Sequence, residues 1–552
     1  MKILFRGVKL PWEKVDPLKS VIDNDWLGNT GNMLFHDAAI RSVFIDEDTT
    51  FKFSGSVIDD SEIEQINSEY DYYIIPFADA FRESFIQKLD NFTRNVKILK
   101  IPCVMLSGGF NEAMGVHFTN NPIFPQDEAV KRFCSAILDK CVSIGVRGET
   151  TRDYLVKHLG FPSGSVDVIG CPSMHLFSKT NEALHKEHIN DVPQKIATNF
   201  RPENLGKDSE AGYIKLKKLI LGVWNEYPQS YYYPQLLSEA RLWAFGYPCN
   251  IKQQDYPVSL THMLSIENRI RFCTNTFTWI DSLREMDFSI GIRLHGTIAA
   301  VLAGIPSLLV TSDSRSVEVA KYHNIPSVSV DEITESMRVE DLFERAVQGM
   351  PDLARIKEQN YNDYVSYLNR NGIKNIFSNS DGNTPVFDDM VRDTKFPKPI
   401  ESFSAVSVSE QEARLTYYYR NLGTQINEQK KQIKKQTVQI EKFDTHKYDY
   451  MEHIEFQLRA NNIKYVAIYG SGKTACRLIE GLSSVKVCFI IESDEKKWGE
   501  RLNGIPIVSL EEAVNQNCRN IIIGSINFKE EIIKRMHKQR DVNKENIRIF
   551  NI

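Results

Sequence analysis

The sequence predicts an α/β protein with two Rossmann-like lobes, a helical linker and a small Rossmann-like domain at its C-terminal end. Short apolar runs alternate with segments of helical periodicity along most of the chain, which is the pattern of parallel sheets. Several of these runs lead into a glycine turn or an arginine directly before the next helix. With 552 residues the chain is too long for one hydrophobic core. We therefore expect four segments, at 1–185, 186–378, 379–460 and 461–552.

Composition and charge restrict what the protein can bind. The chain has 67 Lys and Arg residues against 72 Asp and Glu residues, a net charge of −5, so no nucleic-acid partner is expected. The hydrophobic fraction is 42%, and no apolar run is long enough to cross a bilayer. The apolar run at the N-terminus is interrupted by the charge of Arg6. We therefore expect a cytoplasmic protein without a signal peptide. The nine cysteines occur singly, without C-x-x-C or zinc-finger spacing, so we expect reduced thiols and no metal site.

The first lobe opens with a strand at Lys2–Val8 and a loop at Gly28–Asn32, followed by a helix that reaches Val43. Two glycines and two asparagines before a helix form a loop that can approach a ligand closely. An ordinary turn and helix cap explains the loop equally well. The residues of interest there are Asn29, Gly31 and Asn32. Further strands are expected at 72–76, 98–106 and 142–146.

Two later turns of this lobe follow strand ends. Gly108 and Gly109 form a second glycine turn after the strand that ends at Leu106, and Arg147 follows the strand at 142–146. A helix is expected at 149–159 and a strand at 166–169, before a turn at 170–173. The polar run 179–193 is typical of a connection between lobes.

The second lobe begins with a strand that carries Asn199 and Arg201, and a helix at 214–224 follows. Its most informative stretch predicts a strand at 288–292, a helix at 298–304 and a strand at 305–310. The turn between the first strand and the helix carries Arg293, His295, Gly296 and Thr297. Ligands of parallel sheets lie at such turns, where an arginine can bind an anion and an imidazole can move a proton. Alternatively, Arg293 pairs with a structural carboxylate and His295 caps the helix.

The segment 379–408 is rich in Pro, Ser, Asn and Asp, which indicates a linker. Apolar residues then recur at heptad spacing through 411–443, so we expect a short coiled coil and a homo-oligomer. A helix packed on its own domain is the competing interpretation.

The C-terminal domain starts with a strand at 464–469 that enters a glycine turn. A Walker A loop is excluded because its first glycine would fall on Ala467, whereas G-x-G-x-x-A fits, with acidic residues after the next strand. The turn and the strand end predict a nucleotide or nucleotide-sugar site, although a structural or docking role explains the same pattern. The residues in question are Gly470, Gly472, Lys473, Glu492 and Asp494.

Three motifs resemble the polysaccharide pyruvyl transferase family over about residues 1–375. They are S-I-G-V-R-G-E-T-T-R-D-Y-L at 143–155, G-C-P-S at 170–173 and I-G-I-R-L-H-G-T-I-A-A-V-L-A-G-I-P at 290–306. The resemblance implies two lobes in a GT-B-like arrangement. It implies a transferase that moves the enolpyruvyl group of phosphoenolpyruvate onto two hydroxyls of a sugar in a surface or capsular polysaccharide or its precursor.

The resemblance also implies roles for the residues named above. Arg147 and Arg293 would bind the carboxylate and phosphate of the donor, and His295 would act as acid and base with Arg293 beside it. Residues on the substrate walls would be Asn29, Gly31, Asn32, Gly108, Gly109, Asn199, Arg201, Gly296 and Thr297. No cofactor is implied beyond phosphoenolpyruvate as donor, and a lipid-linked acceptor would bring the protein to a membrane surface without inserting it.

Two features depart from the family's usual pattern. Asn32 stands where many members have an acidic residue, and 75–79 replaces a glycine-rich turn. Both features lie on the side of the site where the resemblance places the acceptor sugar. A glycosyltransferase that uses a nucleotide sugar in the same cleft, and a non-catalytic scaffold of glycan assembly, are the competing functions.

Overall fold

The computed structural model describes residues 1–112, 118, 122–177, 192–200, 211–249, 256–378, 386–445, 448–524, 529–538 and 547–550. Among these residues the chain forms two compact units, Met1–Leu422 and Gly423–Ile552. The predicted α/β class is confirmed, because parallel sheets with helices between their strands form both lobes of the first unit. No described helix is both long and apolar enough to cross a membrane.

The first lobe is built on a four-stranded parallel sheet with the order β2-β1-β3-β4. A bridge between Gly108 and Val146 extends this sheet to a further parallel pair, β5 and β6. The strands are β1 (Lys2–Arg6), β2 (Thr50–Ser54), β3 (Tyr72–Pro76), β4 (Cys103–Leu106), β5 (Ile144–Val146) and β6 (Val166–Val168). The helices are α1 (Pro17–Asp23), α2 (Gly31–Val43), α3 (Ile63–Glu69), α4 (Ile86–Ile98), α5 (Asp127–Leu138) and α6 (Glu149–Asp153).

Two elements of this lobe differ from the sequence-based prediction. The strand expected at 98–106 begins only at Cys103, because α4 keeps its amphipathic face buried as far as Val96 and the chain then turns. The helix expected at 149–159 is α-helical only to Asp153 and continues as a π-helical turn, Tyr154–His158.

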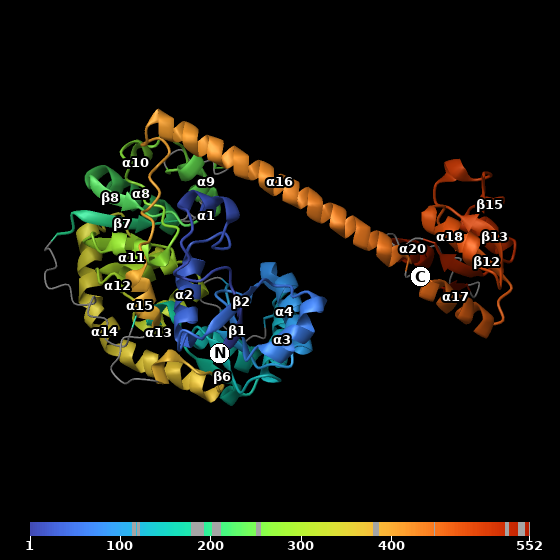
Figure 1. Cartoon of the computed structure of the whole chain (residues 1–552), viewed down its shortest axis with the longest axis horizontal. Coiled ribbons are helices and arrows are strands. Elements are labelled where there is room, and N and C mark those ends of the chain that lie inside the picture. Colours follow the sequence, from blue (N-terminus) through green and yellow to red (C-terminus); the bar gives the residue numbers. More distant parts are fainter. Residues whose placement is uncertain are drawn as a thin grey trace. The chain divides into compact units, whose positions relative to one another are not determined.

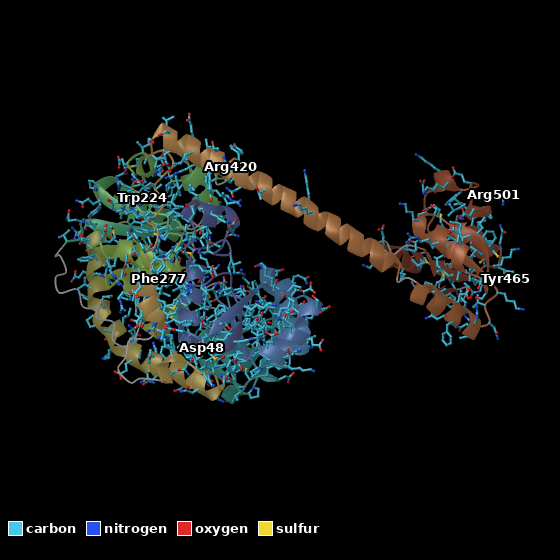
Figure 2. All side chains as sticks on the ribbon, in the orientation of Figure 1. Asp48, Trp224, Phe277, Arg420, Tyr465 and Arg501 are labelled. Carbon is cyan, nitrogen blue, oxygen red and sulfur yellow. The ribbon has the colours of Figure 1, made fainter. Side chains whose placement is uncertain are left out.

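The second lobe has a five-stranded parallel sheet with the order β11-β10-β9-β7-β8. Its strands are β7 (Lys195–Asn199), β8 (Gln229–Tyr232), β9 (Phe288–Gly291), β10 (Ser307–Thr311) and β11 (Ser327–Ser329). Its helices are α8 (Ala211–Glu226), α9 (Leu237–Phe245), α10 (Met263–Ile266), α11 (Thr276–Leu283), α12 (Leu294–Leu302), α13 (Ser314–His323) and α14 (Val339–Arg370). Trp224, which Figure 2 labels, is buried in the core of this lobe.

The 32-residue helix α14 joins the two lobes (Figure 1). Its first turns pack Leu342 and Phe343 into the core of the second lobe. Near its end, Tyr364 donates a hydrogen bond to the hydroxyl of Ser42 (2.9 Å), and Tyr367 donates to the carbonyl of Met105 (2.6 Å). One helix therefore fixes both sheets, and α12 of the second lobe also packs on α2 of the first.

The segment 379–408, expected to be a linker, is in part packed on the lobes. Helix α15 (Val386–Asp393) buries Phe387 in the core, and Arg41 of α2 donates two hydrogen bonds of 2.7 Å to Asp388. Farther on, the backbone N–H of Ile400 donates a hydrogen bond to the carbonyl of Phe272 (2.8 Å). The apolar residues scattered among the polar ones hold this segment on the lobes, which composition did not reveal.

Helix α16 (Val408–Thr445) covers the whole segment expected to form a coiled coil, and α17 (Tyr448–Ala460) follows it. Most side chains between 425 and 450 lie outside the described residues. The homo-oligomer through 411–443 therefore stays a prediction. The expected interlobe connection at 179–193 likewise falls almost wholly outside the described residues.

The second unit contains a six-stranded sheet with the order β14-β15-β13-β12-β16-β17, parallel except for β14. The strands are β12 (Tyr465–Tyr469), β13 (Lys486–Ile491), β14 (Arg501–Leu502), β15 (Ile505–Val508), β16 (Asn520–Ile523) and β17 (Arg548–Phe550). The helices are α18 (Lys473–Gly481), α19 (Leu510–Asn515) and α20 (Lys529–Lys538). The order of the strands reverses at β12, so the turns after β12 and β16 meet at one edge of the sheet.

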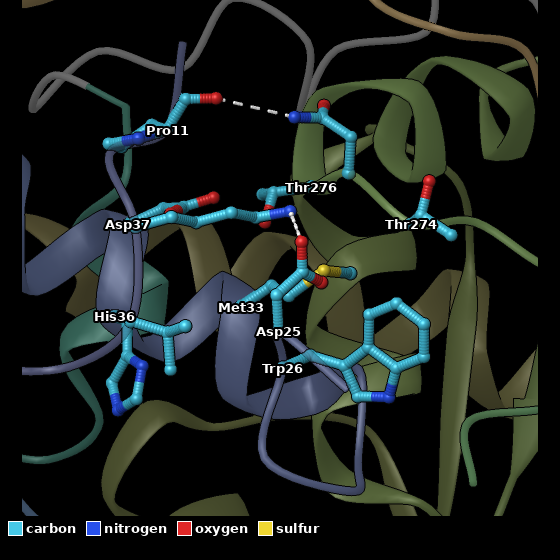
Figure 3. Close-up of a pocket in the computed structure, with 11 residues that line it drawn as sticks. Pro11, Asp25, Trp26, Met33, His36, Asp37, Thr274 and Thr276 are labelled. Atoms are coloured by element: carbon cyan, nitrogen blue, oxygen red, sulfur yellow. Dashed lines mark hydrogen bonds and ion pairs between the residues drawn. The ribbon is translucent and has the colours of Figure 1, made fainter. Parts of the chain in front are cut away.

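A small cavity of about 20 Å³ lies where the lobes meet, and Figure 3 shows its lining. The amide of Asn275 in the second lobe donates a hydrogen bond to the carbonyl of Pro11 in the first (3.3 Å). Lys9 pairs with Asp25 at 2.8 Å beside it. Asp37 is buried in the same place, and burial raises its pKa to about 7 against the opposing effects of Thr276 and Lys9.

The buried carboxyl of Asp37 makes stability depend on pH. Its pKa when unfolded is about 4, so between pH 4 and 7 the folded state binds the proton more tightly, and stability falls as pH rises through that range. Asp37→Asn removes this titration. We expect its melting temperature to exceed that of the wild type at pH 8, from a difference on the order of 4 kcal/mol at most, and the difference to shrink as the pH falls toward about 4.

The measurement is differential scanning calorimetry of both proteins across about pH 4 to 8, the range between the two pKa values and just above it. Asp48→Asn is the matched control, because Asp48, which Figure 2 labels, is exposed and does not line this cavity. Identical profiles for Asp37→Asn and the wild type would show that Asp37 does not titrate in this range.

Candidate functional site

Arg147 directly follows β5 and is fully buried at the carboxyl edge of the first lobe's sheet. Its Nε donates a hydrogen bond to the hydroxyl of Ser107 (3.3 Å), and its guanidinium carbon lies 5.4 Å from the ring centre of Phe35. Neither Nη1 nor Nη2 has a hydrogen-bond partner among the described residues. A buried cation with two unpartnered donors is a costly arrangement that an anion between them would satisfy.

The glycine turn after β4 makes room for this arginine. A Cβ at residue 109 would lie 2.6 Å from the carbonyl oxygen of Ala78 and 2.9 Å from Cδ of Arg147, so only glycine fits there. Ser107 has a φ of +60°, a strained conformation for a residue with a side chain, and its hydroxyl donates to the carbonyl of Gly170 (2.8 Å). At residue 108 a Cβ would lie 2.6 Å from Cε of Met105. The absence of a side chain at Gly109 thus leaves room for Arg147, and its absence at Gly108 leaves room for Met105.

His295 lies in the first turn of α12 and approaches the same place from the second lobe. The centre of its ring is 6.0 Å from that of Phe35, and its Nε2 is 3.7 Å from Sγ of Cys171. Burial, followed by the positive charge of Arg147, lowers the pKa of His295 well below its ordinary value. The imidazole is therefore neutral at physiological pH, so one ring nitrogen can accept a proton and the other can donate one.

Arg315 adds a second cation to this group from the start of α13. It forms ion pairs with Asp79 of the first lobe (3.3 Å) and with Asp313 (3.1 Å). Glu318, one turn farther along α13, accepts hydrogen bonds from the backbone N–H (2.9 Å) and the hydroxyl (2.8 Å) of Thr151, and burial raises its pKa to about 7. Both lobes therefore contribute charged groups around Arg147.

Arg293 takes a different place. Its Nε donates to the carbonyl of Phe200 (3.0 Å), its Nη2 pairs with Glu239 (3.4 Å), and the ion pair is almost completely buried. Its Nη1 has no hydrogen-bond partner among the described residues. Both of its partners belong to the second lobe, whereas Arg147 belongs to the first. The alternative interpretation of this residue, a pair with a structural carboxylate, describes its observed contacts.

The loop at Gly28–Asn32 connects the lobes beside His295. Asn29 accepts a hydrogen bond from the backbone N–H of Gly31 (2.9 Å), and the backbone N–H of Thr30 donates to the carbonyl of Gln235 in the second lobe (2.9 Å). A Cβ at residue 31 would lie 2.8 Å from Nδ1 of His295. Gly31 is therefore required for the close approach of the imidazole to the start of α2. Asn32 faces a separate cavity in the first lobe.

The other residues predicted to lie at this turn contact its backbone or pack closely against it. Asn199 accepts a hydrogen bond from the backbone N–H of Arg293 (3.1 Å), and a Cβ at Gly296 would lie 2.6 Å from Nε2 of Gln235. The hydroxyl of Thr297 is buried and donates to the carbonyl of Arg293 (3.4 Å). Arg201 lies outside the described residues.

In the C-terminal unit, a cavity of about 480 Å³ opens at the edge where the strand order reverses. Gly470, Gly472 and Glu492 line it, together with Ser471 and Lys497. The carboxylate of Glu492 accepts a hydrogen bond from Ser471 (2.6 Å) and lies 3.6 Å from Nζ of Lys497. Lys473 and Asp494 are not among the residues that line the cavity, and Asp494 instead accepts from the backbone of Lys496 (3.1 Å).

Sequence reasoning did not single out several groups that surround Arg147. Arg315 lies in the first turn of α13, four residues after the end of β10, whereas Arg147 directly follows β5, so a search for arginines directly after strands would have missed it. Cys171 lies in the G-C-P-S motif but gave no chemical signal of its own. Phe35, Asp79 and Glu318 carry no local signature, because only the approach of the two lobes brings them together. No group of three or more metal-binding side chains occurs among the described residues.

Comparison with known proteins gives two family matches. The model of the polysaccharide pyruvyl transferase family matches residues 32–314, and a model described as C2185-like, N-terminal, matches residues 462–548. No curated protein matches the chain.

Solved structures show only weak similarity. The UDP-GlcNAc 2-epimerase from Neisseria meningitidis, bound to UDP-GlcNAc, is 12% identical, with 66% of this chain and 100% of that chain covered and a TM-score of 0.36. The UDP-GlcNAc 2-epimerase from Methanocaldococcus jannaschii is 13% identical, with 71% and 99% covered and a TM-score of 0.32. The UDP-D-quinovosamine 4-dehydrogenase from Vibrio fischeri is 16% identical, with 16% and 77% covered and a TM-score of 0.14. TM-scores this low give no information on substrate.

The pair of Arg293 and Glu239 can be tested by neutralising the carboxylate. Glu239→Gln keeps the shape of the side chain but leaves Arg293 as an uncompensated buried cation, which costs about 3–5 kcal/mol. We expect a loss of this size in the free energy of unfolding, measured in urea. Glu267→Gln is the control, because Glu267 is half exposed where it pairs with Arg269.

Added phosphate then separates the two interpretations of Arg293. If its unpartnered Nη1 faces a bound anion, phosphate will stabilise Glu239→Gln more than the wild type. Equal stabilisation of both proteins identifies the arginine as structural.

Proposed function

This chain belongs to the polysaccharide pyruvyl transferase family, and from that premise we propose that it transfers the enolpyruvyl group of phosphoenolpyruvate to a sugar. The acceptor is a surface polysaccharide or its precursor, and the product is a pyruvate ketal. Family membership makes the protein a transferase. The observation that carries the proposal is Arg147, a buried cation with two unpartnered donors beside the neutral imidazole of His295.

The donor matches the charges of this site. Phosphoenolpyruvate has a carboxylate and a phosphate, each of which can accept paired hydrogen bonds from a guanidinium group. Arg147 offers Nη1 and Nη2 for one of these groups, and Arg315, which pairs with Asp79 and Asp313, lies in the same group of residues. Because the site is buried, the attraction between these charges is stronger than it would be in water.

The reaction needs proton movement but no further reactant. One sugar hydroxyl adds to the central carbon of the enolpyruvyl group, whose methylene carbon takes up a proton and becomes a methyl group. A second hydroxyl then displaces the phosphate, which leaves with the other hydroxyl proton. His295 suits this sequence because its neutral ring can take a proton from a hydroxyl and return it. Arg147 stabilises the negative charge that collects on the departing phosphate.

The transfer is tested by measuring phosphate release from phosphoenolpyruvate in the presence of a saccharide acceptor. His295→Gln should lower kcat by about 10²–10⁴, the usual contribution of an acid–base group. Arg147→Gln should lower kcat/KM by about 10²–10³, because one charged donor pair is lost. Arg152→Gln is the matched control, since Arg152 is partly exposed on the helix that follows Arg147.

Full turnover in both site variants would overturn the assignment. Release of a nucleoside diphosphate from a nucleotide sugar, without phosphate release from phosphoenolpyruvate, would identify a glycosyltransferase instead. The absence of any turnover with saccharide acceptors would favour a scaffold.

The cavity of the C-terminal unit supports a second binding function, for a nucleotide or nucleotide-linked sugar. It lies where the strand order reverses, which is where nucleotides bind in sheets of this kind. A Cβ at Gly472 would meet no atom within 4 Å, so a larger side chain there would project into open space instead of clashing with the protein. Gly470 has a φ of +107°, which favours glycine.

A charge substitution tests this cavity. Gly472→Asp places a negative charge at the start of α18, where it should repel a phosphate group and weaken the binding of UDP or UDP-N-acetylglucosamine by at least about tenfold. Isothermal titration calorimetry on the full chain measures the effect. Asn515→Asp, an exposed site on α19 with the same charge change, is the control. No heat of binding with the wild type, or equal binding by all three proteins, would exclude a nucleotide here.

A further inference from the structure

The cavity that Asn32 faces lies beyond the carboxyl ends of three strands of the first lobe, and we call it the N-lobe pocket. Its volume is about 280 Å³, and its lining includes Arg6, Asn32, Phe35, Asp79, Arg82 and Lys88. Arg6 is the last residue of β1, and Asp79 follows β3. In the order β2-β1-β3-β4 the connections turn to opposite sides between β1 and β3, and ligands of parallel sheets bind at such a position.

The N-lobe pocket carries an excess of positive charge. The carboxylate that lines the pocket is that of Asp79, and this carboxylate already pairs with Arg82 and with Arg315. Among the described residues neither Arg6 nor Lys88 forms an ion pair, although Asp79 lies near enough to Arg6 to favour its charged form. Burial lowers the pKa of Arg6 only to about 10, so the guanidinium stays charged at neutral pH, whereas burial holds the pKa of His36 at about 3 and keeps that ring uncharged.

Aromatic rings hold both free cations in place. The guanidinium carbon of Arg6 lies 5.1 Å from the ring centre of Phe77 and 5.6 Å from that of Phe92, and its Nη1 donates to the carbonyl of Pro76 (2.6 Å). The ammonium group of Lys88 lies 5.3 Å from the ring centre of Phe85. Contacts of this kind orient a cation without neutralising it.

The pocket shares a wall with the candidate catalytic site. Phe35 lines the pocket, and the same ring contacts both Arg147 and His295. Asp79 lines the pocket and pairs with Arg315. A molecule in the pocket would therefore lie beside the ring that contacts the group assigned to move the proton.

We propose that the N-lobe pocket binds the acceptor and that the acceptor is an anionic saccharide, whose phosphate or carboxylate group is bound by Arg6 and Lys88. This inference rests on the proposed transfer for its biological meaning, but binding alone can test it. It also explains Asn32, which stands where an acidic side chain would add a negative charge to the wall of a pocket that binds an anion. A neutral acceptor would form no ion pair with either cation.

Isothermal titration calorimetry on the full chain, without phosphoenolpyruvate, compares three probes: D-galactose, D-galactose 1-phosphate and D-galacturonate. We expect at least one anionic probe to bind at least about tenfold more tightly than galactose, because each charge-assisted hydrogen bond contributes that much or more. Which of the two binds identifies the negative group as phosphate or carboxylate. Raised salt should weaken this binding.

Two variants and one control locate the site. Arg6→Gln and Lys88→Gln should each weaken the binding of the anionic probe by about tenfold or more. Lys88 is exposed, so its variant tests the proposal even if Arg6→Gln folds poorly. Lys97→Gln is the matched control, because Lys97 is exposed on the same helix but outside the pocket, and it should bind as the wild type does.

Three outcomes overturn the proposal: equal binding of neutral and anionic sugars, binding that both variants leave unchanged, or competition in which phosphoenolpyruvate displaces the sugar phosphate. The last would make the pocket a donor site. Phosphate release from phosphoenolpyruvate is measured separately. Its absence together with intact, variant-sensitive binding would reject the proposed transfer and leave the anionic pocket standing.

Discussion

The buried charge of Arg147 is the constraint on which the arrangement of this site depends. A guanidinium group removed from water needs hydrogen-bond acceptors, and only its Nε has one among the described residues. The surrounding residues are fitted to that side chain: Ser107 holds a strained backbone to reach it, Gly109 gives it space, and Phe35 covers its face. A structure that keeps such a group buried without acceptors for its other donors loses stability.

The positive charge of Arg147 also acts on His295, which approaches it from the second lobe. Burial and the positive charge of Arg147 together keep His295 neutral, so the guanidinium group and the imidazole can lie side by side without repelling each other. Neither lobe provides this combination alone. Arg147 comes from the end of β5, and His295 comes from α12 of the second lobe. Helix α14 and the pairing of Thr30 with Gln235 hold the lobes at the distance that the site requires.

Arg147 and Arg293 show that an arginine's position after a strand predicts its role less well than its surroundings in the folded protein do. Arg147 and Arg293 both follow a strand end, and the sequence makes them equivalent. In the structure a buried glutamate, Glu239, lies within reach of Arg293, whereas the acids near Arg147 are bound by other groups, Asp79 by Arg315 and Glu318 by Thr151. The difference arises from residues distant in the chain. The packing of the segment around α15 likewise depends on residues distant in the chain, because Arg41 of α2 supplies a partner that the local composition could not reveal.

The sequence by itself determined the α/β class, the alternation of strands and helices, and the turns where chemistry can occur, because these follow from periodicity and from glycine and arginine at strand ends. It also placed Arg147, His295 and Gly31 among the candidates. Only the tertiary structure decided which candidates meet, since the contacts of Phe35 with Arg147 and His295, and of Asp79 with Arg315, each join parts of the chain that are far apart in sequence. The positive N-lobe pocket belongs to this second group, because a pocket's charge is the sum over side chains that folding alone brings together.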